Sequence, residues 1–530
     1  MRSYGYGVSR QQRRPKRRFF KLFILVLFAA GAYLGYRQLT KPTPQEVVDN
    51  RVVFDSSFTE GEKQKVSDAI IRQSKNVKGI TTAKIETSSI APAPGSIVLE
   101  AYVPVTHVYS PTQLTTKAEL LSTTVSVWHE VDATAKTAIA ESLGIDITNV
   151  ETLNSLEELE QDEIVILPVS LLTKDLKLLT FEGTYYLDNF AGGAVFRQVS
   201  FSGDSAQEFS DLSLNTLPTK ELTLKINQTG VTALTRVMMK KLNTVGDPLY
   251  FSEKIGDFLA DADITHVSNE VSFKDGCGFS NTLFCSDPRF IETLKDSGVD
   301  LVEITGNHNN DVGSQFNTDT IIQYRALGWS VVGGGLNTED ARKFYIADQK
   351  QSKVAILGYN YPDSPNGGAI ARESSAGANS FDFEKIKVDI ESAKQQANFV
   401  IVDVQYWECY SYPDGYVEFP QCDKPIGEQE SVFKRLVDLG ADMVVGSSAH
   451  QPQTYEIYNG KPIYYGLGNL YFDQTQWPGT ERGIILTHYF AKGVLLQTKL
   501  SPTTYGDALQ TELSDNEEAV YLLNRLNTAR

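Results

Sequence analysis

Polar side chains that could bind an ion or move a proton follow four short apolar runs in the second half of the chain. The loops contain two of the six histidines together with carboxylates and amides, and their sequences are SNE at 268–270, GNHNND at 306–311, QYWE at 405–408 and GSSAH at 446–450. Carboxylate, amide oxygen and imidazole hold a borderline-hard divalent ion and leave a position for water. Without a metal, the same groups could form an acid–base pair or bind a polar ligand.

The segments that position these loops alternate between predicted helices and strands. Asp287-Pro288 is typical of a helix start, Gly298 ends that helix, and the strand 299–304 follows. The helix 428–439 precedes the strand 443–445 in the same way. This alternation predicts an α/β fold, a layered sheet with parallel strands and helices on its faces. Because function collects at the carboxyl ends of such strands, we expect the four loops to meet at one edge of a single sheet.

The order and spacing of these strings, from about residue 221 to 495, resemble the CapA (poly-gamma-glutamate capsule synthesis) family, which has a metallophosphatase-like fold. The matching strings are SNE, TGNHNND, VVGGGLNTEDA and GADMVVGSSAHQPQTYEIYNGKPIYYGLGN. The resemblance covers about half of the chain. It implies a cluster of Asp, Glu, Asn and His around one or two divalent ions, where an ion would activate water or polarise a phosphoryl or carbonyl oxygen.

The resemblance assigns roles to individual residues. The catalytic candidates are Glu270, His308, Glu408 and His450. One divalent ion would be held by Glu270, Asn307, His308 and His450. The candidates for ligand binding are Arg236, Asn269, Asn307, Asp311 and Gln405. Asn469 is interpreted as a turn residue, and a structural role for His308 beside Asp311 stays open.

Three ligand positions of the family lack the expected side chain. The segment 222–232 has no acid where the first motif has Gly-Asp, and Gln405 stands where the fourth motif has His. The fifth motif has two or three histidines in a GHHPH-like string, but the segment 446–450 reads GSSAH and only His450 remains. Even the loss of an outer-shell partner costs roughly 10–100-fold in metal affinity. We therefore expect a degenerate site that binds one divalent ion or none.

The N-terminus predicts export. Residues 1–45 carry ten Lys or Arg and no acid, and an apolar run follows most of them. Because basic residues stay in the cytoplasm, we expect a basic cytoplasmic segment at 1–18, a transmembrane anchor at 19–36, a linker at 37–50 and an extracellular main body. A cleaved signal peptide is the alternative, since Ala30-Gly31-Ala32 fits a cleavage site.

Four cysteines form two close pairs in the sequence, Cys277 with Cys285 and Cys409 with Cys422. Exported proteins with an even number of cysteines usually pair them. Neither pair has the CxxC spacing of zinc sites, so we favour two local disulfides over a four-Cys zinc site. Each disulfide would restrain a loop beside the predicted site.

The chain is long enough for several domains. Residues 51–215, with a helix at 61–75 and strands at 97–103 and 163–169, predict a smaller α/β domain with a weak likeness to half of a solute-binding domain. The CapA-like domain spans 220–500, and 501–530 is a C-terminal tail with an amphipathic stretch near 515–526. The net charge of −17 argues against nucleic-acid binding.

Two functions compete. One is attachment or binding of an anionic cell-surface polymer by a degenerate site. The other is metal-dependent hydrolysis or transfer at an amide or phosphoester of such a polymer. An acidic body repels a polyanion unless basic residues converge, and the candidates are Arg236, Lys240, Lys241, Arg289 and Arg325. A receptor role, with a small ligand bound by residues 51–215, is a third reading.

Overall fold

The computed structural model describes residues 43–528 except 74, 76, 78, 89–90, 124, 156–157, 210–211, 213, 215–216, 281, 362–368, 407–425 and 476–478. Within those residues, no helix has the length and apolar character needed to cross a membrane. Several predictions fall outside the described residues: the basic segment 1–18, the anchor 19–36, Glu408, Cys409 and Cys422. They stay predictions.

Contacts divide the chain into two compact units, and the described part of the smaller one covers 43–86, 95–97 and 199–214. Its elements include α2 (Pro44–Arg51), β1 (Val52–Phe54), α3 (Glu60–Arg72), β2 (Thr81–Ser88) and η4 (Ala206–Phe209). Strands β1 and β2 pair in parallel. Helix α2 lies inside the predicted linker, because Thr43 and Glu46 form a capping box ahead of Pro44.

The larger unit holds residues 87–94, 98–198 and 215–530. In its first part, β3 (Ile97–His107) pairs with β7 (Ile164–Pro168) and β8 (Leu176–Leu178), and β5 (Val125–Trp128) pairs with β6 (Val150–Leu153) and β7. The other elements of this part are β4 (Leu114–Thr115), α4 (Lys117–Leu120), α5 (Ala133–Leu143), η1 (Ile147–Asn149), η3 (Val169–Leu171), β9 (Thr180–Phe181), α6 (Tyr186–Asn189) and β10 (Val195–Gly203).

The rest of the larger unit contains two large sheets. The first has the order β14-β13-β12-β11-β24-β25-β26, with β23 also paired to β11. Its strands are β11 (Thr223–Thr232), β12 (Ile264–Asn269), β13 (Val299–Glu303), β14 (Ser330–Val332), β23 (Asn469–Tyr471), β24 (Arg482–Ala491), β25 (Val494–Thr504) and β26 (Glu512–Leu513). Strands β11 to β14 run parallel, and β24 is antiparallel to both β11 and β25.

The second sheet has the order β16-β17-β19-β20-β22-β21. Its strands are β16 (Tyr345–Gln349), β17 (Ser352–Asn360), β19 (Phe399–Gln405), β20 (Met443–Ser447), β21 (Tyr455–Tyr458) and β22 (Lys461–Tyr464). Strands β17, β19, β20 and β22 are parallel. All seven residues of β19 are buried, as expected of a parallel strand covered on both faces. A short pair, β15 (Gly334–Gly335) with β18 (Gly377–Ala378), stands apart from both sheets.

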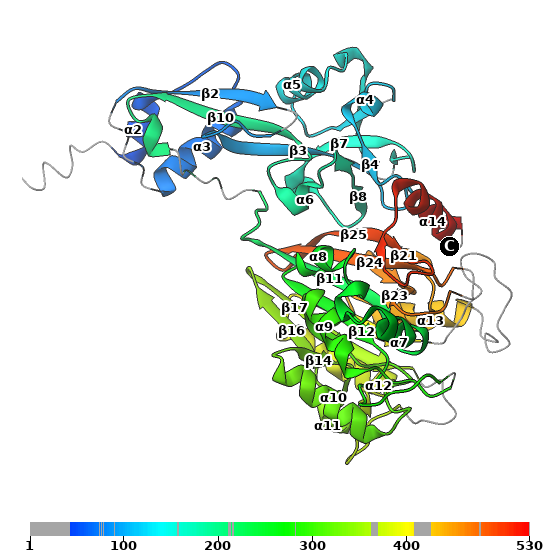
Figure 1. Ribbon diagram of the computed structural model, residues 1–530. Coiled ribbons are helices and arrows are strands. Elements are labelled where there is room, and N and C mark those ends of the chain that lie inside the picture. The colour runs from blue at the N-terminus through cyan, green and yellow to red at the C-terminus, as the bar shows by residue number, and fades with distance from the viewer. Residues whose placement is uncertain are drawn as a thin grey trace, which may run out of the picture. The chain divides into compact units, whose positions relative to one another are not determined.

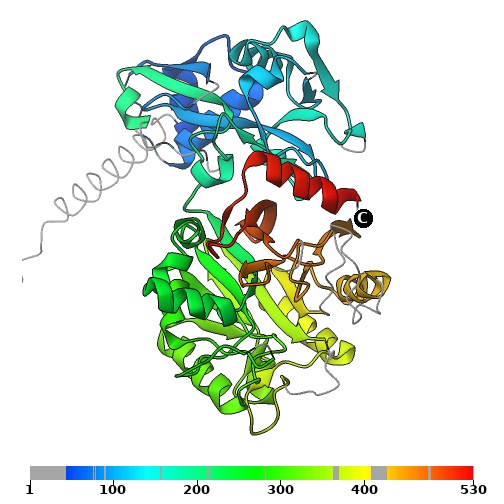
Figure 2. The same cartoon turned by 45° about the vertical axis from the view of Figure 1, so that its right-hand side comes forward.

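Helices cover the outer faces of the two sheets, and in Figures 1 and 2 these helices run from green to yellow-orange. One hydrophobic cluster joins residues of both sheets, including Ile226, Leu301, Ile356 and Ile401, so these sheets pack face to face. A second cluster packs the first sheet against α7 (Arg236–Val245), η5 (Pro248–Phe251), α8 (Gly256–Ala260), η6 (Pro288–Phe290), α9 (Ile291–Asp296) and α10 (Ser314–Ala326). A third packs the second sheet against α12 (Phe383–Lys394) and α13 (Ile426–Asp438).

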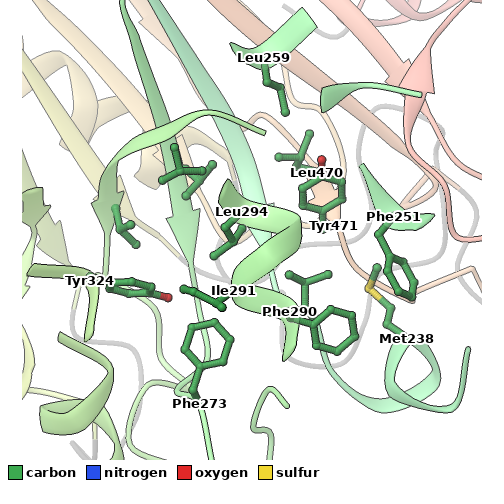
Figure 3. Packing of buried hydrophobic residues seen from close by; sticks show 14 of the residues in the cluster. Met238, Phe251, Leu259, Phe273, Phe290, Ile291, Leu294, Tyr324, Leu470 and Tyr471 are labelled. Atoms are coloured by element: carbon green, nitrogen blue, oxygen red, sulfur yellow. The ribbon is translucent and has the colours of Figure 1, made fainter. Parts of the chain in front are cut away.

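The layers are therefore helix, sheet, sheet and helix, an α/β arrangement of the kind the sequence predicts. Figure 3 shows Ile291 and Leu294 of α9 among Phe273, Tyr324 and Tyr471 on the helical side of the first sheet. The short helix α11 (Thr338–Ala341) follows β15.

The C-terminal tail contributes to this core. Helix α14 (Asn516–Thr528) buries Leu522, Leu523 and Leu526 in the cluster between the sheets. Thr454 donates a hydrogen bond to the carbonyl of Leu526 at 2.8 Å. The amphipathic stretch predicted near 515–526 is thus the helix that completes the fold.

Candidate functional site

The four polar loops follow strands of two different sheets. Loops 270–272 and 304–311 follow β12 and β13 of the first sheet, whereas Gln405 ends β19 and loop 448–451 follows β20 of the second. The expectation of a single sheet is therefore wrong. The alternation of strands and helices shows that parallel strands exist, but it does not show which of them share a sheet.

Gln405 connects the loops of both sheets. Its Nε2 donates to Oε1 of Glu270 at 3.1 Å and to Oδ1 of Asn307 at 3.2 Å, and its Oε1 accepts from Ser447 at 3.2 Å. Glu270 is buried, and its second oxygen, Oε2, is a buried atom with no hydrogen-bond partner. Sequence analysis placed Glu270 and Asn307 among the ligands of one ion and Gln405 among the ligand-binding candidates, and the fold brings these three together.

Gly306 allows this close approach. A Cβ atom at residue 306 would lie 2.6 Å from Cα and 2.5 Å from Cγ of Glu270. Only glycine fits the GN string here, because the backbone before Asn307 runs directly against Glu270.

The side chains around Gln405 do not fit the two-ion centre that the family implies. An ion held by Glu270 and Asn307 would lie between their oxygens, and the amide group of Gln405 donates its hydrogens to these same oxygens. Among the described residues, Glu270, His308 and His450 do not form a group whose ligand atoms all lie within 4.8 Å of one another. The predicted ligand set stays a prediction, and we derive no step through an ion here.

His308 pairs with a carboxylate. Its Nδ1 lies 2.8 Å from Oδ2 of Asp311, which also accepts the backbone N–H of Phe284 at 2.9 Å. The imidazole and the Phe284 ring have centroids 4.4 Å apart. A histidine oriented by a carboxylate in this way can exchange a proton with a bound molecule.

Arg236 is held by an internal ion pair. Its Nε donates to Oδ1 of Asp473 at 2.8 Å, and Oδ2 of the same carboxylate accepts the N–H of Val237 at 2.6 Å. The guanidinium lies between two rings, 4.8 Å from the centroid of Phe284 and 4.6 Å from that of Phe472. The charge of Arg236 is therefore balanced within the protein. Its guanidinium links Phe284, which contacts His308, to Phe472, which contacts His450.

His450 is buried and bonded to Asn469. Its Nδ1 lies 2.9 Å from Oδ1 of Asn469, and its ring centroid is 5.2 Å from that of Phe472. The interpretation of Asn469 as a turn residue is wrong, because it begins β23 and its Nδ2 donates to the carbonyl of Thr480 at 3.0 Å. A turn reading of LGNLYF considers only neighbours in sequence, whereas β23 pairs with the distant strand β11.

Three residues of this region have strained backbone conformations. Arg236, Ser448 and His450 have φ values of 47°, 82° and 57°, in the left-handed region that non-glycine residues avoid. Such residues cost roughly 1–3 kcal/mol each and persist where the surrounding structure demands them, often at functional sites. Strain therefore supports a functional role for this region, independently of its residue types.

The remaining candidates have structural contacts. Asn269 is buried, and its Nδ2 donates to the carbonyl of Val271 at 2.7 Å and to the hydroxyl of Tyr324 at 2.8 Å. The Cys277–Cys285 disulfide is present, as predicted. It closes the loop that ends beside Phe284. Sequence analysis did not select Phe284, Phe472 or Asp473, since aromatic and acidic residues outside the four loops carry no local signal.

A second polar group was missed entirely. His266 of β12, Glu303 of β13 and Asp403 of β19 are buried, with ligand atoms within 4.8 Å of one another. Burial raises the pKa of Glu303 to about 7 and that of Asp403 well above its ordinary value, and burial lowers the pKa of His266 to about 3. In the alternating pattern of a strand, isolated polar residues resemble solvent-facing positions, so the sequence did not reveal them.

Comparison with known proteins identifies relatives of this region. Residues 225–474 match the family described as bacterial capsule synthesis protein PGA_cap. The capsule biosynthesis protein CapA of Bacillus anthracis is 29% identical over 203 residues, which are 38% of this chain and 46% of that protein. The PGA biosynthesis protein CapA of Bacillus subtilis (strain 168) is 28% identical over 218 residues, 41% of this chain and 54% of that protein.

The chain thus spans about half the length of the curated relatives it matches. Among solved structures, the calcineurin-like phosphoesterase YfkN of Bacillus subtilis aligns with 58% of this chain and 99% of its own, with 13% identity and a TM-score of 0.30. No argument about function rests on so low a score.

The helix–sheet–sheet–helix layers with polar loops at the strand ends define a layered α/β domain. Residues 225–474, just under half of the chain, match the PGA_cap family of bacterial capsule synthesis proteins, as the resemblance to CapA predicted.

Proposed function

We propose that this protein is a membrane-anchored, extracellular accessory protein of capsule synthesis that binds or attaches an anionic polymer of the poly-gamma-glutamate type. The names of its relatives refer to capsule and PGA biosynthesis. The basic segment 1–18 followed by the apolar run 19–36 supports an anchor with the main body outside.

The observation that carries a binding role is Gln405. Its amide occupies the space between Glu270 and Asn307, where the family pattern implies a metal and an imidazole. Hydrogen bonds between uncharged and acidic groups thus hold these loops together. Such a site can recognise a ligand while lacking the metal that would activate water.

Basic residues near α7 supply the positive charge that a polyanion needs. Lys240 and Lys241 lie on this helix, with their Nζ atoms over the rings of Phe279 and Tyr250. Arg289 donates to Oδ1 of Asn243, on the same helix, at 2.6 Å, but its charge is balanced by an ion pair with Asp287 at 2.8 Å. Arg325 lies apart from this group and pairs with Asp340.

Binding of soluble poly-gamma-glutamate to the full chain in detergent micelles tests this function. We expect binding that weakens with salt and drops about tenfold in Lys240→Glu with Lys241→Glu, a loss of about 1.4 kcal/mol. Lys353→Glu, on the opposite sheet, is the matched control and should bind as the wild type does. An intact protein that shows no affinity for the polymer would refute the proposal.

A metal-dependent hydrolase or transferase is the second candidate, and the His308–Asp311 pair favours it. If the protein acts in this way, incubation with the polymer shortens or modifies its chains, and His308→Ala abolishes the change. Measured chain length after incubation separates this reaction from binding alone.

A further inference from the structure

The space between the two sheets contains a polar group that the proposed function does not use. His266 projects from β12, Glu303 from β13 and Asp403 from β19, so both sheets contribute. His266 Nε2 lies 3.8 Å from Oε2 of Glu303 and 3.8 Å from Oδ2 of Asp403. The three side chains have exposed fractions of 3% or less.

Each carboxylate is oriented by outer hydrogen bonds that leave one oxygen toward His266. Gln228 Nε2 donates to Oδ1 of Asp403 at 2.7 Å, Thr305 Oγ1 donates to Oε1 of Glu303, and Ser268 also donates a hydrogen bond to the Glu303 carboxylate. The other oxygens, Oδ2 and Oε2, are the ones that face the imidazole. Outer partners that fix ligand oxygens in this way are typical of metal sites.

Several atoms of the group lack hydrogen-bond partners although they are buried. They are Nδ1 and Nε2 of His266 and Oδ2 of Asp403. A buried polar atom without a partner costs about 1–3 kcal/mol, and a buried ionised carboxylate costs more. A cation between these two side chains would provide a partner for Nε2 of His266 and Oδ2 of Asp403, and Oε2 of Glu303 lies close enough to bind it as well.

From this geometry we propose that His266, Glu303 and Asp403 bind one divalent transition-metal ion, such as Zn²⁺, between the two sheets. Two carboxylates and a dication sum to zero charge, which suits a buried position. Ligands about 2.1 Å from a tetrahedral ion lie about 3.4 Å apart, so the 3.8 Å separations close with shifts of a few tenths of an ångström. One imidazole with two carboxylates suits zinc, manganese or iron.

This ion would stabilise the packing of the two sheets. Its ligands would differ from those predicted from the sequence, which are Glu270, Asn307, His308 and His450. Burial keeps the imidazole neutral by lowering the pKa of His266 to about 3, so its nitrogen lone pair is available to an ion. The pair His488 and Gln228 continues the hydrogen-bonded chain from Asp403, with His488 Nε2 3.2 Å from Oε1 of Gln228.

Elemental analysis of the full chain, purified in detergent without chelators from zinc-supplemented cells, tests the proposal. We expect about one zinc per chain in the wild type, and a loss of at least tenfold in Asp403→Asn and in His266→Gln. Glu270→Gln and His308→Ala are the controls and should retain the metal. The proposal would be overturned if the wild type contained no stoichiometric zinc, manganese or iron. The carboxyls of Glu303 and Asp403 would then share a proton instead of binding a metal.

Metal that disappears in Glu270→Gln and persists in Asp403→Asn would also overturn it, since the ion would then lie among the loops. If the variants do not fold, X-ray absorption of the zinc in the wild type decides: one nitrogen and otherwise oxygen ligands are expected, and a sulfur or several imidazoles refute the site. Polymer binding is measured separately, so either proposal can fail alone.

Discussion

At the scale of single residues, Gln405 determines how the loops of the two sheets meet. One side chain donates to Glu270 and Asn307 and accepts from Ser447. A histidine could not make all three contacts, since each of its nitrogens serves a single partner. The family pattern has a histidine at this position, where its imidazole could bind a metal. The amide of Gln405 instead forms a hydrogen-bonding bridge between the loops.

We predict that Gln405→Ala lowers the free energy of unfolding by about 1–3 kcal/mol, because the buried carboxylate of Glu270 loses a donor. Urea denaturation of the full chain measures the change. Gln64→Ala is the matched control. It removes an exposed side-chain hydrogen bond from Gln64 to Asp68 and should change the free energy of unfolding by less than about 0.5 kcal/mol. Equal effects of the two substitutions would contradict the bridging role.

At the scale of elements, the loop between β12 and η6 shapes the surroundings of His308. The Cys277–Cys285 disulfide closes this loop, and Phe284 beside it contacts both His308 and Arg236. The main-chain N–H of Phe284 also bonds to Asp311. The disulfide thus restrains one wall of the site through Phe284.

We predict that Cys277→Ser with Cys285→Ser destabilises the protein by about 2–3 kcal/mol, from the entropy that a short closed loop removes from the unfolded chain. Denaturation with and without a thiol reductant measures it. The reductant should shift the wild type toward the double variant and leave the variant unchanged. If the wild type is insensitive to reductant under unfolding conditions, the disulfide does not contribute.

At the scale of the whole molecule, Asp188 links residues 98–198 of the larger unit to strands β11, β24 and β25 of its first large sheet. Its carboxylate pairs with Lys225 of β11 and Lys499 of β25, both at 2.9 Å, and accepts from the hydroxyl of Tyr489 at 2.6 Å. Burial opposes the charge of Asp188, but the two lysines and the hydrogen bonds outweigh it and lower its pKa. The first part of this unit is therefore attached by a charged cluster as well as by apolar packing.

We predict that Asp188→Asn lowers stability at pH 7 by about 1–3 kcal/mol. The pKa of Asp188 is lower in the folded protein than in the unfolded chain, where it is about 4. The ionised carboxylate therefore stabilises the fold at pH values above about 4, and this stabilisation is lost as the pH falls below that value. The difference in stability between wild type and variant should therefore shrink progressively as the pH falls below about 4. Asp175→Asn, at an exposed pair with Lys174, is the control with little effect. A difference that persists at low pH would contradict the assignment.

The sequence by itself determined the local features of this protein. Helix starts such as Asp287-Pro288, helix ends such as Gly298, the alternation of strands and helices, the nearby cysteine pair and the four polar loops all depend on neighbours within a few residues. Only the tertiary structure decided which strands share a sheet, and hence that Gln405 meets Glu270 and that α14 completes the core. The same holds for His266, Glu303 and Asp403, which are far apart in sequence. Strand pairing buries apolar faces over long chain separations, and no short segment contains that information.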